Sequence, residues 1–129
     1  MKIRGMTSLL LPMLFATTVY AAEREITVTL TVPDAAWEIS IEEVHRVKNE
    51  IWVISTVSRN PYLMGAQVIS VVKASIKCAA ADGPVKHFII GKTWNWPNEE
   101  PFTFLKTRQE LDKDLKSGKL LCKGTGREP

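Results

Sequence analysis

Apolar and polar residues alternate along the first part of this chain. In residues 26–32, aliphatic side chains fill every second position and threonines fill the positions between them. This period of two predicts a β-strand with one buried face, a pattern typical of antiparallel sheets. A second alternation begins at Trp37 and slips near Glu43 and Val44, which indicates a bulge or the end of the strand.

The following segments continue the β pattern. Residues 51–57 are apolar on both faces, which predicts a central strand. The polar residues 48–49 separate it from the previous strand, so we expect a hairpin there. A long run over residues 66–78 alternates in the same way and places Cys78 on the inward face, and residues 85–90 form a further apolar strand.

One helix is expected near the end of the chain, from about residue 108 to residue 116. Thr107 and Glu110 have the spacing of a capping box, with Thr107 as the N-cap. Leu111 and Leu115 lie one helical turn apart and form a narrow apolar stripe. The helix therefore has one face that can pack on a sheet.

The order of these segments predicts the fold class. Short strands are expected before and after the helix, at residues 102–104 and 120–122. The pattern favours a mainly β fold: an antiparallel β-sandwich, Ig-like or a half-open barrel, with one short C-terminal helix. The alternative is an α+β fold in which the helix packs on one curved sheet. No repeat or linker divides residues 22–129, which predicts a single exported β-rich domain.

Residues 1–21 have the composition of a signal peptide. Lys2 and Arg4 give a positive start, residues 9–16 are mostly apolar, and Val19 and Ala21 supply the residue types found before a cleavage site. The apolar stretch is shorter than the roughly 20 residues needed to span a bilayer. We therefore expect a periplasmic or secreted protein with no stable membrane anchor after cleavage.

Removal of this segment changes the charge balance. The full chain has 17 basic and 14 acidic residues, and loss of Lys2 and Arg4 leaves 15 basic residues against the same 14 acidic ones. No concentrated basic stripe remains, so nucleic acid is not an expected partner. The remaining residues contain no N-x-Ser/Thr sequon, which favours a bacterial periplasm over a eukaryotic secretory route.

Cys78 and Cys122 are the only cysteines of the chain. In an oxidising compartment an even pair in a small domain predicts a disulfide bond. A redox-active pair would have closer spacing, and a zinc site would need further ligands nearby. With the cysteines bridged and Met64 as the only methionine after residue 21, we expect neither a copper site nor any other metal or cofactor.

The segment from Gly91 to Phe102 is the most unusual of the sequence. We select it as a candidate binding loop because rigid aromatic side chains dominate the energy of protein interfaces, and flanking prolines reduce the ordering cost. The alternative is that one or both tryptophans cap the core, and we expect this of at least one. The candidate binding residues in this loop are Trp94, Asn95, Trp96, Asn98, Glu99 and Glu100.

A second candidate binding surface follows an Asn-Pro turn at residues 60–61. Tyr62, Leu63 and Met64 form an apolar tip there. A preorganised apolar loop can insert into a cleft of another protein at low entropic cost. The alternative is that Leu63 and Met64 fold back over the core.

Catalytic groups are not evident in the sequence. The adjacent pairs Glu42–Glu43 and Glu99–Glu100 are expected to be solvated, because neighbouring carboxylates do not face each other across a substrate. His45 and His87 are the only histidines, lie outside known catalytic motifs, and are expected at the surface. No catalytic residue is therefore predicted, and we do not expect an enzyme.

These features predict a small exported, non-catalytic binding module that acts on an extracytoplasmic protein or an envelope component. An enzyme inhibitor is one form that such a module takes. Two alternatives stay open. One is a small-ligand carrier or enzyme that uses His87 or His45 beside a carboxylate. The other is a structural subunit of an envelope assembly that pairs through an exposed edge, such as the Thr-rich first strand.

Overall fold

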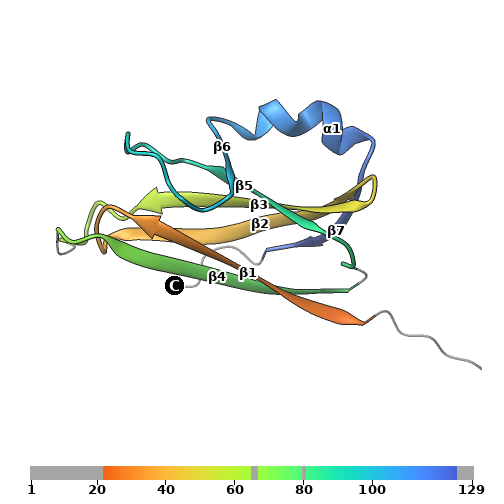
Figure 1. Ribbon diagram of the computed structural model, residues 1–129, viewed down its shortest axis with the longest axis horizontal. Coiled ribbons are helices and arrows are strands. Elements are labelled where there is room, and N and C mark those ends of the chain that lie inside the picture. The colour runs from red at the N-terminus through yellow and green to blue at the C-terminus, as the bar shows by residue number, and fades with distance from the viewer. Residues whose placement is uncertain (1–21, 65–66, 80, 125–129) are drawn as a thin grey trace, which may run out of the picture.

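The computed structural model describes residues 22–64, 67–79 and 81–124, which form two β-sheets and one short helical segment (Figure 1). Residues 1–21, which contain the expected signal peptide, lie outside the described residues. The elements in chain order are β1 (Glu23–Val32), β2 (Trp37–Val47), β3 (Glu50–Arg59), β4 (Ser70–Ala79), β5 (Val85–Ile90), β6 (Thr103–Leu105), η2 (Arg108–Leu111), α1 (Asp112–Lys116) and β7 (Lys119–Lys123).

The strands pack as a sandwich of unequal sheets. One sheet has two strands, β1 and β4, and the other has five in the order β6-β5-β3-β2-β7. The β1–β4, β2–β3 and β2–β7 pairs are antiparallel, whereas the β3–β5 and β5–β6 pairs are parallel. The predicted mainly β sandwich is confirmed. The chain leaves the larger sheet after β3 and passes through β4 in the smaller sheet. It then re-enters the larger sheet as β5, which runs in the same direction as β3.

The alternating residues of β1 supply the core, as their period predicts. Ile26, Val28, Leu30 and Val32 are all buried and pack against aliphatic residues of the five-stranded sheet. The β2–β3 hairpin also forms as expected, and the slip of its pattern is a register shift between Ile41 and Glu43. β3 is central, with β5 on one side and β2 on the other.

The helical segment covers the outer face of the larger sheet. Leu111 and Leu115 are buried there against Val47, Ile54 and Phe88. The predicted helix is present but begins as a 3₁₀ turn. At its start the Glu110 carboxylate accepts a hydrogen bond from the Thr107 backbone N–H at 3.1 Å, the return half of the expected capping box. Among the described residues, no helix is long and apolar enough to cross a membrane.

The predicted disulfide bond joins the two sheets. Cys78, in β4, is buried at 1% exposure and is bonded to Cys122, in β7, with a Cα–Cα distance of 6.0 Å. This bond fixes β4 above the β7 side of the larger sheet. Because disulfides persist in oxidising compartments, it indicates a protein that works outside the cytoplasm.

The strand expected over residues 66–78 is shorter than its pattern suggests. β4 begins only at Ser70, and residues 67–69 belong to the preceding loop; residue 66 lies outside the described residues. From Ser70 onward the alternation holds, with Lys73 and Lys77 exposed and Cys78 buried. The β-rich composition of residues 68–69 therefore reflects exposed loop side chains and not a longer strand.

Candidate functional site

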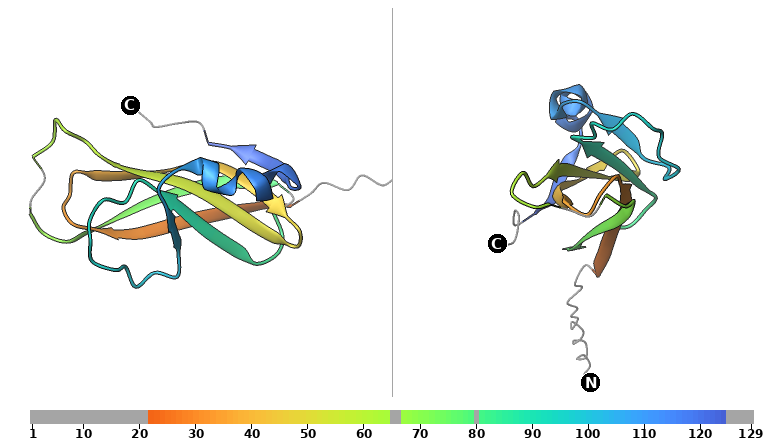
Figure 2. Two further views of the ribbon diagram at one scale, coloured as in Figure 1. Left: turned by 90° about the horizontal axis from the view of Figure 1, so that it is seen from above. Right: turned by 90° about the vertical axis from the view of Figure 1, so that its left-hand side faces the viewer.

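Three loops meet at one end of the sandwich (Figures 1 and 2). They connect β1 to β2 (residues 33–36), β3 to β4 (residues 60–69) and β5 to β6 (residues 91–102). The β3–β4 loop projects furthest from the sheets in the left view of Figure 2. Both segments selected from the sequence as binding candidates therefore lie at the same end of the molecule.

The bases of the first two loops are joined by hydrogen bonds. The Arg59 guanidinium donates to Asp34 at 3.1 Å, and the other carboxylate oxygen of Asp34 accepts the Ala36 N–H at 2.8 Å. The Ala36 N–H, with the Arg59 guanidinium second, holds the pKa of Asp34 below its usual value. The Asn60 N–H donates to the Ala36 carbonyl at 2.9 Å. The β3–β4 loop therefore leaves the sandwich from a fixed base.

The tip of the β3–β4 loop is strongly exposed. Tyr62 is 91% exposed, Leu63 48% and Met64 98%. The alternative that Leu63 and Met64 fold back over the core is therefore wrong. The tip is shaped by Asn60, whose side-chain oxygen accepts the Tyr62 N–H at 2.9 Å and whose carbonyl accepts the Leu63 N–H at 3.3 Å.

Further apolar side chains extend this exposed tip. Among the described residues, all exposed large hydrophobic side chains except one lie between positions 62 and 71. The exception is Leu120, in β7. We call these exposed apolar residues the apolar loop; they are Tyr62, Leu63, Met64, Val68 and Ile69 in the β3–β4 loop and Val71 at the start of β4. Concentration of exposed apolar residues in one segment is typical of a protein or membrane contact surface.

Trp94, in the β5–β6 loop, has a structural role. Its ring packs edge-on against Trp37 at a centroid distance of 4.9 Å, and its Nε1–H donates to Asn98 at 2.7 Å. Trp96 lies against Trp94, with centroids 5.6 Å apart, and is half-buried. The expectation that at least one tryptophan caps the core is confirmed by Trp94.

Glu100 is partly buried and is anchored to β1. Its carboxylate accepts hydrogen bonds from the Thr31 N–H at 2.8 Å and the Thr31 hydroxyl at 2.7 Å. Asn98 donates to the other Glu100 oxygen at 2.8 Å and to the Thr31 carbonyl at 2.9 Å. Burial raises the pKa of Glu100, but these hydrogen bonds outweigh it and leave the pKa below its usual value. The expectation that both carboxylates of this pair are solvated is therefore wrong for Glu100, which is bonded to Thr31. It holds for Glu99, which is exposed.

The β5–β6 loop thus divides into anchors and accessible residues. Trp94, Asn98 and Glu100 hold the loop against β1 and β2, whereas Asn95 and Glu99 are exposed. These three anchoring residues already have partners within the domain. A structural role does not exclude contact with another protein, so their selection as binding residues stays a prediction. The sequence shows the loop but does not show that Thr31 is its anchoring point.

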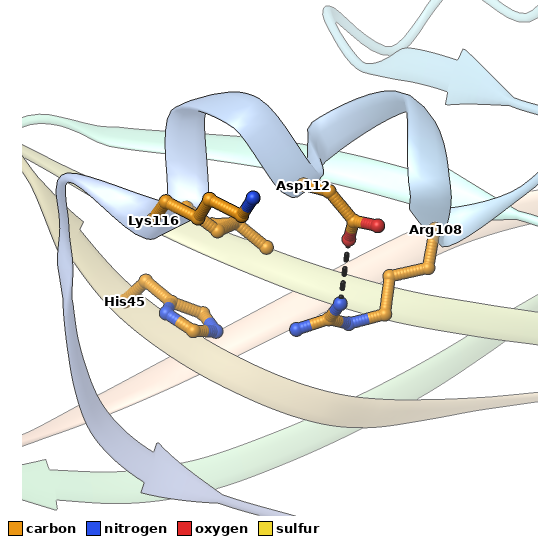
Figure 3. A pocket seen from close by; sticks show the side chains of 5 residues that line it. His45, Arg108, Asp112 and Lys116 are labelled. Carbon is orange, nitrogen blue, oxygen red and sulfur yellow. Dashed lines mark hydrogen bonds and ion pairs between the residues drawn. The ribbon is translucent and has the colours of Figure 1, made fainter.

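A second cluster of polar residues lies at the other end of β2, under the helix. Glu43 accepts two hydrogen bonds from Arg108, at 2.8 and 2.9 Å, and lies 2.6 Å from His45 Nε2. Arg108 also pairs with Asp112 at 2.9 Å. His45, Arg108, Asp112, Leu115 and Lys116 line a shallow pocket of about 220 Å³ (Figure 3).

The positions of Glu43, His45 and His87 correct two expectations. The predicted solvation is wrong for Glu43, whose side chain is 17% exposed and is bonded to Arg108 and His45; these contacts lower its pKa to about 2. The predicted surface position is wrong for His45, which is 6% exposed. His87 is half-buried against Phe102, with ring centroids 5.0 Å apart, and burial lowers its pKa. Strand alternation in β2 fails after the bulge, which is why the sequence did not place Glu43 and His45 correctly.

The chemistry available to this cluster is limited. A carboxylate beside a histidine can orient a general base, but the five residues that line the pocket include no serine, cysteine or threonine that could act as a nucleophile. In the described part of the chain, no group of three or more His, Cys, Asp or Glu residues could hold a metal ion. The bidentate Glu43–Arg108 contact instead joins η2 to β2, a structural use of charge.

Comparisons with known proteins give no relative from which a role could be transferred. No protein-family model, no curated protein and no solved structure matches this chain. The candidate surfaces are therefore weighed on their geometry alone.

Proposed function

We propose that this protein is a small extracytoplasmic, non-catalytic binding module that engages another protein or an envelope component through the apolar loop. The observation that carries this proposal is the exposure of Tyr62 and Met64, at 91% and 98%. Exposed apolar surface has no stabilising role in the isolated domain, and its burial by a partner releases roughly 25 cal/mol per Å².

The architecture around the apolar loop supports this use. The Asn60 hydrogen bonds and the Arg59–Asp34 ion pair fix the base of the loop in the free protein. Binding therefore loses less conformational entropy at the loop. A tyrosine at the tip supplies a large contact area with a polar end, which is typical of residues that dominate interface energies. A convex apolar tip is complementary to a cleft, so inhibition of an enzyme is one form of this function.

The test uses two leucines of equal exposure. Leu63 is 48% exposed in the apolar loop, and Leu120 is 47% exposed in β7. A photo-crosslinking residue at position 64 is expected to give a discrete adduct in native envelope extract, and unlabelled protein should compete for it. Leu63→Ala should reduce this adduct and Leu120→Ala should not. Equal adducts from both variants would contradict the proposal.

Export through residues 1–21 is the second part of the proposal. The positive start, the short apolar stretch and the Val19 to Ala21 site support a cleaved signal, and the disulfide fits the oxidising compartment that it leads to. Mass spectrometry of the protein from periplasm and culture medium is expected to show a chain beginning at Ala22. A chain that retains residues 1–21 in the mature fraction would contradict cleavage.

A small-ligand function is a second candidate. It is supported by His45, which lies in the pocket under the helix beside the Glu43 carboxylate. NMR spectra of the His45 ring during titration with small carboxylates, amines and phosphates test it. If none of these shifts the His45 signals, while the folded spectrum is unchanged, the pocket does not bind such ligands.

A further inference from the structure

The two sheets of this sandwich are of unequal width, and the difference falls beside β1. Two strands face five. The Cys78–Cys122 bond fixes β4 over the β7 side of the larger sheet, so β1 lies one strand further toward β5. Neighbouring strands are about 4.8 Å apart, and β5 and β6 therefore extend beyond β1 with no strand opposite them among the described residues.

The free edge of β1 carries unpaired backbone groups. In an antiparallel strand, alternate residues direct both N–H and C=O toward the same side. The Thr31 N–H and C=O bond to Glu100 and Asn98, on the side away from β4. By the same alternation, Glu25, Thr27 and Thr29 direct their backbone groups to this side, and no partner for these groups is found in the described part of the chain.

The other long edges carry lysines within or at both ends of their strands, whereas β1 carries charged residues only at its start, Glu23 to Glu25. Lysines at an edge are a common device that prevents edge-to-edge association. β4 carries Lys73 and Lys77, and β7 begins and ends with lysine. From Ile26 to Val32, β1 contains neither lysine nor proline. The side chains of Asn98 and Glu100 bond to this edge only at Thr31 and leave the rest open.

We propose that the free edge of β1, from Glu25 to Thr29, binds an extended β-strand of another protein. The added strand would lie over β5, β6 and the end of the loop between them, where Val85, Phe104 and Phe102 are only partly buried against the core. Its inward side chains are therefore apolar. Glu25 is exposed and lies opposite Lys77 of β4, and on its other side it would favour a basic side chain of the added strand, because opposite charges stabilise cross-strand pairs.

A second copy of this chain does not fit the same edge in an antiparallel pair. Symmetric antiparallel β1–β1 pairing has its two-fold axis perpendicular to the sheet, and it would place both larger sheets on the same side of the joined pair of small sheets. Each larger sheet extends past its own β1 by β5 and β6, so the two overhanging parts would occupy the same space. The edge therefore accepts a single strand more readily than a second domain. This site is separate from the apolar loop, and either can fail without the other.

The experiment measures hydrogen exchange of the chain from residue 22 onward, with a synthetic peptide as probe. The peptide has about ten residues, with valine at alternate positions and threonine or lysine between them. In the free protein the amides of Glu25, Thr27 and Thr29 are expected to exchange rapidly, and those of Val28 and Leu30 slowly. Addition of the peptide should slow exchange at the first three by about tenfold or more.

Two variants separate strand pairing from a general effect on folding. Thr27→Pro removes an N–H that points away from β4, so the β1–β4 ladder keeps its bonds, and the peptide affinity should fall by about tenfold or more. Thr27→Ala keeps the N–H and should bind normally. If Thr27→Pro does not fold, the exchange data on the unsubstituted protein decide alone.

Three results would overturn the proposal. The first is no peptide-dependent protection of Glu25, Thr27 and Thr29. The second is protection equal to that at the β4 edge, at Lys73. The third is slow exchange of the three β1 amides before any peptide is added, whether or not it depends on protein concentration, because the edge would then be covered by a second copy or by the chain itself.

Discussion

The carboxylate of Glu100 replaces a neighbouring strand for Thr31. It accepts both the backbone N–H and the hydroxyl of Thr31, at 2.8 and 2.7 Å. Asn98 completes the arrangement by donating to the Thr31 carbonyl. Through these bonds the β5–β6 loop is fixed to the end of the small sheet, which places Trp94 against Trp37 at the end of the sandwich.

Replacement of Glu100 should destabilise the domain far more than replacement of its neighbour. Glu100→Ala leaves the Thr31 N–H without its acceptor, and loss of a charge-assisted bond of this kind costs about 1–3 kcal/mol. Glu99 is exposed and is the matched control, so Glu99→Ala should change the free energy of unfolding by less than about 0.5 kcal/mol. Urea unfolding of the two variants measures the difference. Equal losses would show that the Thr31 contact is unimportant.

The two candidate binding loops should respond to substitution in opposite ways. Trp94→Ala removes a ring packed on the core and should lower the free energy of unfolding by about 3 kcal/mol. Met64→Ala, at a side chain that is 98% exposed, should leave stability within about 0.5 kcal/mol of the original value. Thermal and urea unfolding check both values. A marked loss of stability in Met64→Ala would mean that the apolar loop packs against the domain.

The physical basis of the alternating strands explains how well the sequence predicted the fold. A period of two in β1 requires one buried face whatever the partner strand, and the hairpin and the disulfide follow from local turns and from the number of cysteines. The strand directions in the larger sheet could not be predicted from these local patterns. They depend on the crossing of β4 to the other sheet, because of which β5 runs parallel to β3.

The environment of single polar residues could not be predicted in the same way. The anchors of Glu100 and Glu43 are Thr31 and Arg108, which lie 69 and 65 positions away in the chain. No local pattern encodes such distant contacts. The exposure of Leu63 and Met64 also depends on where the chain turns after Asn60, and the sequence alone left open whether these two side chains are exposed or fold back over the core.

Removal of the disulfide should destabilise the domain without changing its fold at low denaturant. The bond closes a separation of 44 residues, for which loss of chain entropy in the unfolded state is worth about 4 kcal/mol. The double variant Cys78→Ala with Cys122→Ala should unfold at a correspondingly lower urea concentration. Reduction of the original protein should increase its mass by two hydrogens, as observed by mass spectrometry. Unchanged stability in the double variant would contradict the predicted contribution.

The Glu43–Arg108 pair should make stability depend on acid pH. Contact with Arg108, and secondly with His45, lowers the pKa of Glu43 from 4.5 to about 2 in the folded chain. A carboxyl group with a depressed folded-state pKa stabilises the fold above its unfolded pKa, and this contribution is lost as the pH falls from about 4.5 to about 2. With allowance for the partial exposure of Arg108, this contribution to the free energy of unfolding amounts to about 2 kcal/mol.

Unfolding free energies of the original protein and Glu43→Gln should differ at pH 6 and converge near pH 2. The matched control is Glu42→Gln, which alters the neighbouring carboxyl group but leaves the Glu43–Arg108 contact in place, so the loss of stability that Glu43 causes between pH 6 and pH 2 should remain. A constant difference between the original protein and Glu43→Gln over this range would show that the charge of Glu43 is not what stabilises the contact between the helix and β2.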